Sequence, residues 1–473
     1  MSDHDYQPAT AGWRDLLTRE HLPKFVTLCF ALWLHASNSM LAATTMPSAI
    51  EDIGGLHLIS WTFALYLAGS IAAAASISAI VSRLGIRPTM LRAAVIYTVG
   101  CIVVASAQFM PILLCGRLLQ GVGGGALIAL VYISQDRYFP NSVVARMVAM
   151  YSVVWTTAAF CGPAIGGAFA TWGLWRMAYW LFAFQGLLLI PAIVYLFPGD
   201  ADRQGPQDRI PLVRIGMLFA VILMFSLSSV DFDALWSPLM VVVGTVSLIW
   251  FVIRDRQSEL GRILPMAAVN LRHPIGNGVL ATFLISLCIM SFIVYGPLIL
   301  INLYGLSPLL AGFVILVESL AWGFSAVMLS GTPPEREPVL IRVGSLLIVI
   351  GLIGLAVSFP SGNLVAVIVT AIIGNAGMGM MWGFIIKRMG GHAEPGDEVR
   401  TASMLPITQQ TGFALGAALS GLIANGLGLE DTSDNDMFRL VSFWLFAGFV
   451  PLAMVANLFS WRFVSFNQMD SQA

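Results

Sequence analysis

The stretch Pro111-Ile-Leu-Leu-Cys-Gly-Arg-Leu-Leu-Gln-Gly-Val-Gly-Gly-Gly-Ala-Leu127 places one arginine, Arg117, in the middle of an apolar segment. A guanidinium held inside a bilayer costs roughly 3 kcal/mol or more on insertion scales, so such a residue is usually retained for a partner or a function. The glycines that follow it remove side chains from one helix face and let another helix approach closely. The stretch therefore predicts a tightly packed transmembrane helix that carries a functional charge.

The composition places this helix in an all-α polytopic membrane protein. Of the 473 residues, 58% are hydrophobic and only 10% are charged, whereas a water-soluble protein carries about 25% charged residues. A net charge of −1 without a basic tail gives no reason to expect nucleic acid as a partner. The five cysteines lie in apolar runs without metal-ligand spacing, so we interpret them as packing residues and expect no metal and no cofactor.

Apolar runs of about 20 residues, each long enough to cross a hydrocarbon core about 30 Å thick, recur along the whole chain. A β-barrel would instead show segments of about ten residues with alternating polarity. Fourteen transmembrane helices are predicted, at about 24–47, 58–82, 90–109, 112–135, 145–171, 176–197, 211–229, 236–253, 275–303, 308–330, 338–359, 363–386, 399–427 and 437–461.

The basic residues support this even number of spans. Lysine and arginine concentrate in cytoplasmic loops, and with a cytoplasmic N-terminus all but three of the 24 basic residues fall on that side. The exceptions are Arg117, Arg176 and Arg439. One missed span would invert the pattern after it. We therefore expect a multi-pass protein of the plasma membrane, the inner membrane of a bacterium, with both termini cytoplasmic.

The longest polar linkers, 198–210, 254–274 and 387–398, suggest how the helices are grouped. Removing the pair 211–229 and 236–253 leaves six helices before it and six after it. This is the helix count of a transporter built from two halves. This pair has no internal ionisable residue and is expected to face lipid. The predicted parts are a cytoplasmic segment 1–23, a six-helix half 24–197, linkers with the inserted pair 198–274, a second half 275–462 and a cytoplasmic tail 463–473.

Several motifs together resemble the major facilitator superfamily, and most of all its fourteen-helix drug:proton antiporters. They are Arg117-x-x-Gln120-Gly121-x-Gly123, Gly162-Pro163-x-x-Gly166-Gly167, Trp61-x-x-x-x-Tyr66, Tyr295-Gly-Pro297 with Gly305-Leu-Ser307-Pro308-Leu-Leu-Ala-Gly312, and Gln410-x-Gly412-x-x-x-Gly416. The resemblance covers nearly the whole chain and implies a major facilitator fold and a transporter rather than an enzyme.

The resemblance also identifies gating residues. Gly162 and Pro163 kink their helix because proline lacks an N–H, and Gly166 and Gly167 suit a hinge or a sealed interface. Ordinary small-residue packing is the alternative. Arg83, Gly85 and Arg87 resemble the family's cytoplasmic latch, with Ser82 at its acidic position. Positive charge on the inner side explains these arginines equally well.

The first helix departs from the family pattern. Counting back from Pro47 places Asn38 where the family usually has an aspartate, and asparagine cannot release a proton. His35 lies about one turn away, and an imidazole titrates near neutral pH, so it is a candidate substitute. A neutral histidine hydrogen-bonded inside the bundle is the alternative.

Glu318 is a carboxyl group in the middle of a predicted span. An intramembrane acid that exchanges protons on alternate faces would couple transport to protons. A static hydrogen-bonded acid joining two helices is the alternative. We predict that Glu318, Arg117 and His35 form the proton-coupling set.

Aromatic, amide and methionine side chains within the spans suit amphipathic or cationic ligands. The predicted substrate cavity contains Trp33, Asn38, Tyr66, Gln120, Tyr151, Trp155, Tyr295, Asn302, Trp322, Asn375, Trp382, Gln409 and Gln410, with Met378, Met380 and Met381 nearby. For any single aromatic residue, packing is the alternative role.

These observations predict a monomeric secondary transporter that exports amphipathic small organic molecules by alternating access, coupled to proton entry. Its partners are the small-molecule substrate, protons and the lipid bilayer. No nucleotide-binding motif is present, so ATP is not expected to drive it. One alternative is a carrier that is independent of protons or that holds an anionic substrate at Arg117. An alternative from another class is a membrane receptor or scaffold without transport activity.

Overall fold

The computed structural model describes residues 16, 18–198, 212–230, 233, 235–257, 262, 264–393, 397–429 and 435–469. Six long helices come first, then a helix pair, then a second set. The first six are α2 (His21–Ile53), α3 (Ile59–Leu84), α4 (Ile86–Ala105), α5 (Met110–Tyr138), α6 (Asn141–Thr171) and α7 (Trp175–Leu196). The pair is α8 (Leu212–Leu227) and α9 (Trp236–Arg256). The second set is α10 (Pro274–Tyr304), α11 (Pro308–Leu329), α12 (Glu337–Ser358), α13 (Leu364–Gly391), α14 (Glu398–Gly426), α15 (Asn435–Ala447) and α16 (Val450–Met469).

The predicted spans match these helices except at two places. The helix predicted at 90–109 is α4, which begins directly after Gly85 because this glycine, at φ +85°, makes the whole turn from α3. The span predicted at 437–461 is present but is not one continuous helix, since the chain breaks at Gly448 and Phe449 into α15 and α16. Pro451 lacks the N–H that would continue the helix, and its ring opposes the carbonyl of Ala447.

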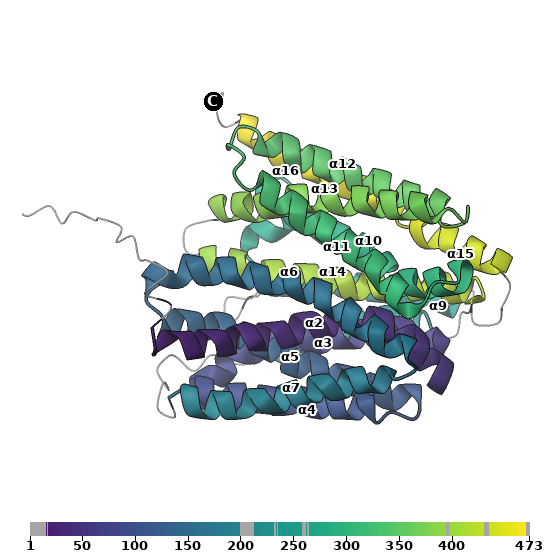
Figure 1. The fold of residues 1–473 in the computed structure, drawn as a ribbon. Helices are drawn as coiled ribbons and strands as arrows, with labels where there is room; N and C mark the ends of the chain where they lie inside the picture. The colour runs from purple at the N-terminus through teal and green to yellow at the C-terminus, as the bar shows by residue number, and fades with distance from the viewer. Residues whose placement is uncertain are drawn as a thin grey trace, which may run out of the picture.

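The two sets have the same internal packing, with α15 and α16 together forming the sixth member of the second set. The first helix of each set packs on the fifth, α2 on α6 and α10 on α14. The second and third helices pack on the fourth, so α3 and α4 contact α5, as α11 and α12 contact α13. This repetition is typical of transporters built from two halves related by an axis along the membrane normal. Figure 1 shows the two halves as separate layers, with α6, α11 and α14 between them.

The halves contact each other mainly on one side of the bundle. We call the side on which α2 begins the near side and the side on which it ends the far side. Toward the far side, the backbone at the start of α11 packs directly on Gly167 of α6. A Cβ on Gly167 would lie only 2.9 Å from Leu309 Cα. Toward the near side, the ribbons of the halves diverge (Figure 1), and α6 exposes the hydroxyl residues Ser152, Thr156 and Thr157.

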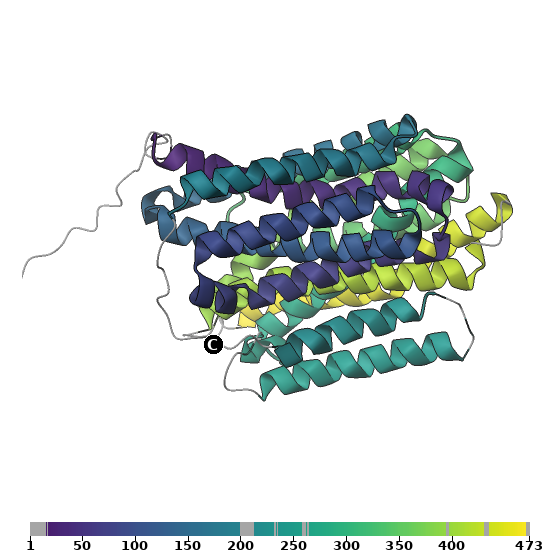
Figure 2. The ribbon, with the colours of Figure 1, turned by 90° about the horizontal axis from the view of Figure 1, so that it is seen from below.

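The inserted pair lies at the edge of the bundle, as Figure 2 shows. Helix α8 packs on α3 and α14, one helix from each half, and α9 packs on α8 and the short helix η2 (Met266–Val269). The pair was expected to face lipid. Helix α9 does leave apolar residues exposed, among them Leu239, Val242, Val246, Ile249 and Trp250, whereas α8 buries Leu218, Val221, Ile222 and Phe225.

Candidate functional site

Arg117 lies fully buried in the interior of the first half, where neutral groups from three helices surround it. Its Nε donates to the carbonyl of Thr62 on α3 at 3.0 Å. Its Nη1 donates to Asn38 Oδ1 on α2 at 2.8 Å and to Gln120 Oε1 on α5 at 2.9 Å. The guanidinium carbon also lies 4.3 Å from the centre of the Tyr66 ring. Three helices are therefore joined through one side chain.

The glycines of α5 allow this close approach. A Cβ on Gly121 would lie 2.0 Å from the carbonyl oxygen of Tyr66, and one on Gly124 would lie 2.7 Å from His35 Nδ1. A larger residue at Gly121 would require α3 to move, and one at Gly124 would displace the His35 side chain.

An aromatic column leads from Arg117 toward the contact between the halves. The hydroxyl of Tyr66 lies 3.0 Å from His35 Nδ1 and donates to the His35 carbonyl at 3.1 Å. The His35 ring stacks on Tyr66 and meets Trp155 of α6 edge-on at 6.1 Å. His35 is buried, and Trp155 is half-buried. The column extends from the buried charge to α6, one of the helices that contact the second half.

No carboxylate contacts Arg117 among the residues that the structure describes, and its Nη2 has no hydrogen-bond partner. Asn38, at the position where the resemblance predicts an aspartate, supplies a neutral oxygen instead. Cys101 was interpreted as a packing residue only, but its sulfur also accepts from Gln120 Nε2 at 3.3 Å. The guanidinium is therefore held by neutral acceptors alone.

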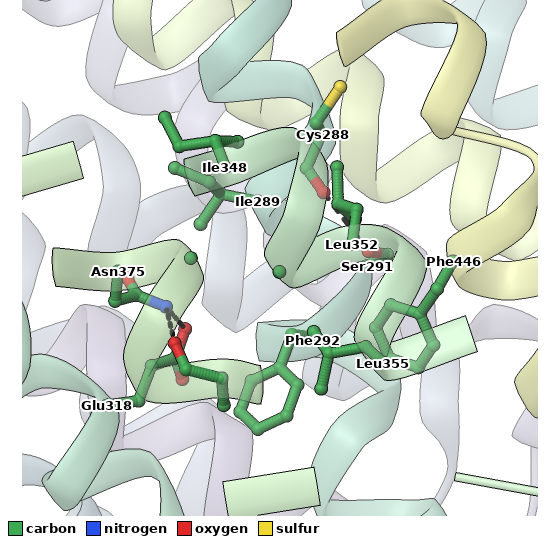
Figure 3. A pocket seen from close by; sticks show the side chains of 13 residues that line it. Cys288, Ile289, Ser291, Phe292, Glu318, Ile348, Leu352, Leu355, Asn375 and Phe446 are labelled. Atoms are coloured by element: carbon green, nitrogen blue, oxygen red, sulfur yellow. Dashed lines mark hydrogen bonds between the residues drawn. The ribbon is translucent and has the colours of Figure 1, made fainter. Parts of the chain in front are cut away.

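Glu318 occupies the interior of the second half. It lies on α11 and is 4% exposed. Asn375 of α13 donates to its Oε1 at 2.5 Å, whereas Oε2 has no hydrogen-bond partner. Figure 3 shows the two side chains meeting from neighbouring helices.

A small cavity adjoins Glu318. About 30 Å³ of it is accessible to water-sized molecules, and one water needs roughly 10–15 Å³ by this measure, so there is room for one or two waters. Apolar side chains form most of its wall (Figure 3), and its lining includes Cys288, Ser291, Phe292, Leu352, Leu355 and Phe446. All the lining residues belong to the second half, so this carboxyl group faces the inside of that half.

Arg117 and Glu318 do not contact each other. The hydrogen-bond partners of Arg117 all lie in the first half, and that of Glu318 lies in the second. Of the predicted proton-coupling set, the structure brings His35 and Arg117 together through Tyr66 and leaves Glu318 apart.

The other predicted cavity residues are dispersed. Tyr151 is buried against Tyr132 and Phe25, and Tyr295 is buried in α10, with neither hydroxyl hydrogen-bonded. Asn302 is exposed at the far end of α10 and donates to the Leu298 carbonyl of its own helix. The half-buried members are Trp33, Trp322, Trp382, Gln409 and Gln410.

The predicted hinge residues lie at contacts between helices. Gly162 and Gly166 face α2, since added Cβ atoms would meet the Ser37 carbonyl at 2.7 Å and Thr44 Oγ1 at 2.3 Å. The carbonyl of Pro163 accepts from Thr44 at 3.2 Å. In the predicted latch, the hydroxyl of Ser82 donates to its own helix, at Ala79. The described contacts include no hydrogen bond or ion pair from Arg83 or Arg87 to the second half.

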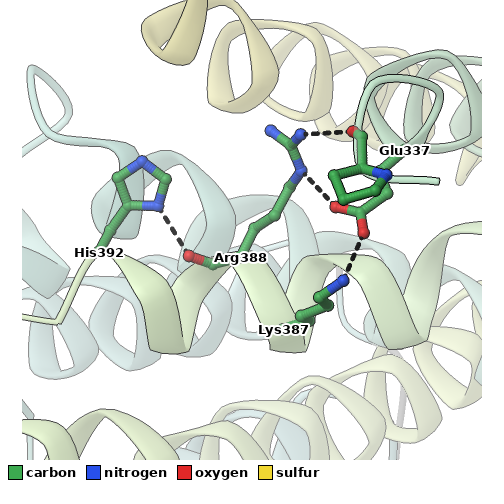
Figure 4. Close-up of polar contacts among 5 residues, drawn as sticks. Glu337, Lys387, Arg388 and His392 are labelled. Carbon is green, nitrogen blue, oxygen red and sulfur yellow. Dashed lines mark hydrogen bonds and ion pairs between the residues drawn. The ribbon is translucent and has the colours of Figure 1, made fainter. Parts of the chain in front are cut away.

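The second half has a carboxylate clamp on the near side that the sequence analysis missed. Glu337 is 2% exposed at the start of α12. It accepts from Lys387 Nζ at 2.7 Å and from Arg388 Nε at 3.0 Å, both at the end of α13 (Figure 4). Helices α12 and α13 are antiparallel and joined by a short connection, so the start of α12 lies beside the end of α13. This expected neighbourhood is the signal that could have located the clamp.

Comparison with known proteins agrees with this architecture. The family model of the Major Facilitator Superfamily matches residues 28–405. A probable multidrug-efflux transporter of Mycobacterium tuberculosis is 27% identical over 88% of this chain and 90% of that protein. A multidrug efflux pump of Staphylococcus aureus is 24% identical over 63% of this chain and 66% of its own.

Solved structures share the fold. A D-xylose–proton symporter superposes with a TM-score of 0.66 at 16% identity, covering 94% of this chain and 98% of its own. A POT family transporter superposes with a TM-score of 0.65 at 16% identity, covering 93% and 96%. The fold expected from the sequence is thus confirmed: two six-helix halves with an inserted pair. The chain belongs to the Major Facilitator Superfamily, and it is a multi-pass membrane transporter of small molecules rather than an enzyme.

Proposed function

We propose that this transporter exports amphipathic small organic molecules in exchange for protons, by alternating access between the two halves. The export role rests on the relatives that are named multidrug efflux proteins. The proton role rests on one observation, the buried carboxyl group of Glu318 with one oxygen unpartnered beside a cavity that can hold water.

The proposed arrangement places both termini in the cytoplasm and the protein in the bacterial inner membrane as a monomer. The near side is then cytoplasmic, which the positive-inside distribution of arginine and lysine supports. The moving bodies are the proposed halves 24–197 and 275–462, with the inserted pair in 198–274 between them. The conformation described would be the one open toward the cytoplasm.

Glu318 suits a proton carrier whose access changes with conformation. Releasing its proton in the state described would leave a carboxylate oxygen without a donor in a mostly apolar cavity, which is costly. We therefore expect the proton to leave only when α11 and α13 shift and water reaches the cavity. Because α11 also contacts α6 of the other half, such a shift would be linked to the movement between halves.

Arg117 has a different proposed role. Its bonds to α2, α3 and α5 hold the first half together as one body, and its charge acts on His35 through Tyr66. Trp155 and the other half-buried aromatic residues are proposed to contact the substrate, by stacking and soft packing.

Reconstituted vesicles with an imposed pH gradient test the proton role. In Glu318→Gln, which keeps the acceptor for Asn375 but cannot ionise, gradient-driven accumulation of a fluorescent amphipathic substrate should be lost. Exchange of labelled for unlabelled substrate, which needs no net proton movement, should persist. Glu51→Gln, the same change at an exposed position at the far end of α2, is the control and should behave as the wild type.

Two results would overturn this proposal. Wild-type uptake that ignores the pH gradient would remove proton coupling, and unchanged gradient-driven accumulation in Glu318→Gln would remove Glu318 from it. The absence of both exchange and uptake in the wild type would favour the receptor or scaffold alternative.

One observation favours a second candidate, a carrier of anionic molecules. Arg117 is a permanent positive charge without a carboxylate in contact among the described residues. A buried cation without a counter-ion attracts negative charge, and an anionic substrate group would supply it. A series of substrates with one scaffold and a carboxylate, amide or quaternary ammonium group separates the candidates, since this carrier would prefer the carboxylate.

A further inference from the structure

Three helices meet on the far side at a point that the proposed transport mechanism has not used. They are the start of α3, the end of α8 and the end of α14. Helix α3 belongs to the first half, α14 to the second, and α8 to the inserted pair. We call the residues that join them the far-side junction, and they are His57, Trp61, Ser226, Ser229 and Asn425.

Asn425 is the centre of the far-side junction. Its side-chain nitrogen donates to the His57 carbonyl at 2.9 Å and to the Ser229 carbonyl in a second, shorter bond. Both acceptors lie just outside regular α-helix, His57 in the short helix η1 (Leu56–Leu58) and Ser229 in the turn after α8. Carbonyls at the C-terminal end of a helix such as α8 have no partner within it, so a side chain can satisfy them.

Two further contacts complete the far-side junction. Trp61 of α3 donates from its indole nitrogen to the Ser226 carbonyl of α8 at 3.0 Å. Gly421, one turn before Asn425, faces both neighbours, because a Cβ there would lie 2.3 Å from Ser60 Oγ and 3.2 Å from the Cβ of Ser229. The end of α8 is therefore attached to both halves at the place where they touch.

These bonds depend on the conformation. Opening the far side requires the end of α14 to leave the start of α3, and the Asn425 amide cannot then reach both carbonyls. The Ser226 carbonyl binds Trp61 of the first half, and the Ser229 carbonyl binds Asn425 of the second half. When the halves separate on the far side, α8 must therefore lose one of these two hydrogen bonds as well. Closure of the far side is thus stabilised by the inserted pair in addition to direct contacts between the halves.

The near side has no equivalent among the described contacts. The predicted latch has Ser82 in place of a carboxylate, and that serine bonds within its own helix. The described hydrogen bonds between the two halves, from Asn425 to His57 and from Leu309 to Thr171, thus lie on the far side.

We propose that Asn425 is a positioning residue of the far-side gate, and that the inserted helix pair works as a strap that holds this gate closed. This role of the strap rests on the alternating access proposed above. Helices α8 and α9 thereby take part in closing the far-side gate. Transporters that consist of two six-helix halves alone close this gate without such a pair.

The strap can be tested by hydrogen–deuterium exchange of the full-length protein in lipid nanodiscs. Asn425→Leu has nearly the same shape and cannot donate. Losing a neutral hydrogen bond shifts an equilibrium by roughly two- to tenfold, so the backbone at the start of α3 and the end of α14 should exchange several-fold faster. Trp61→Phe, which removes the bond to Ser226 and part of the ring but keeps the Asn425 bonds, should give a smaller increase in the same segments.

Two variants make the test specific. Asn425→Gln keeps both donors and should retain most of the closure. Asn363→Leu makes the same change at the exposed start of α13, outside the far-side junction, and should affect only that helix end. A general loss of packing would instead raise exchange throughout α3 and α14, including their near-side ends.

Wild-type exchange rates at both helix ends in Asn425→Leu and Trp61→Phe would overturn the strap, as would a rise spread over the whole chain. Transport measured on the same preparations separates this outcome from failure of the proposed function. If the wild type transports nothing but Asn425→Leu opens the far side, the export proposal fails and the strap stands. If transport is intact and exchange at the far-side junction is unchanged, only the strap fails.

Discussion

Two buried polar cores occupy matching places in the two halves and are built in opposite ways. In the first half, Arg117 has hydrogen bonds to three groups and a ring beside its guanidinium. In the second, Glu318 has one hydrogen bond, one unpartnered oxygen and a cavity. A group fixed by several bonds suits a structural centre, whereas a group with a free atom and space for water suits a change of state.

Replacing Arg117 with methionine should have the largest effect. It removes the donor from Asn38 Oδ1 and Gln120 Oε1, and each unsatisfied buried group costs roughly 1–3 kcal/mol. We expect the unfolding midpoint in detergent to fall by many degrees and transport to be lost. Arg117→Lys, which keeps the charge but not the fork, should show most of this loss. A lysine variant as active and stable as the wild type would show that charge alone suffices.

Glu318→Gln should change stability little and change the proton dependence of transport strongly. The amide oxygen can still accept from Asn375, and no other described bond is lost. We expect the free energy of unfolding to change by less than about 1 kcal/mol, while the pH dependence of substrate accumulation flattens. A fall in stability as large as that of Arg117→Met would show that both cores are structural.

Asn38→Asp makes the first core more like a conventional ion pair, and its effect should be intermediate. A carboxylate would lie close to Arg117 Nη1, where the amide oxygen now accepts at 2.8 Å. The present bond already involves the charged guanidinium, so the gain comes from the attraction of the new carboxylate, and desolvation of that charge offsets part of it. We expect a slightly higher unfolding midpoint and a shift of substrate preference toward cations. A preference that stays unchanged would separate Arg117 from substrate selection.

The smallest effects should come from two buried cysteines, one beside each core. Cys101→Ala removes the sulfur that accepts from Gln120 and should lower stability by about 1 kcal/mol without altering the pH profile of transport. Cys288→Ala enlarges the space beside Glu318 and should alter that profile with a similar or smaller cost in stability. Identical consequences in both variants would remove the functional difference between the cores.

The helices were predictable because apolar runs and the charged loops between them can be recognised directly from the order of residues in the chain. The positions of Arg117 and Glu318 were also predictable, since charges in apolar runs stand out. The direction in which Glu318 points was not, because α11 is apolar around most of its circumference and its sequence does not fix its rotation. Asn425 gave no signal either, since an asparagine near a helix end is common and its partners are backbone carbonyls.

The exposed face of α9 has a consequence for the membrane around the protein. Helix α9 has 21 residues, about 32 Å at 1.5 Å per residue, which is close to a hydrocarbon core of about 30 Å. A bilayer thinner or thicker than this helix is mismatched to it, at a fraction of a kcal/mol per Å. Because α9 packs on α8, and α8 holds both halves at the far side, this mismatch energy would act on the gate itself. Transport rates measured in vesicles of increasing acyl-chain length should therefore depend on bilayer thickness.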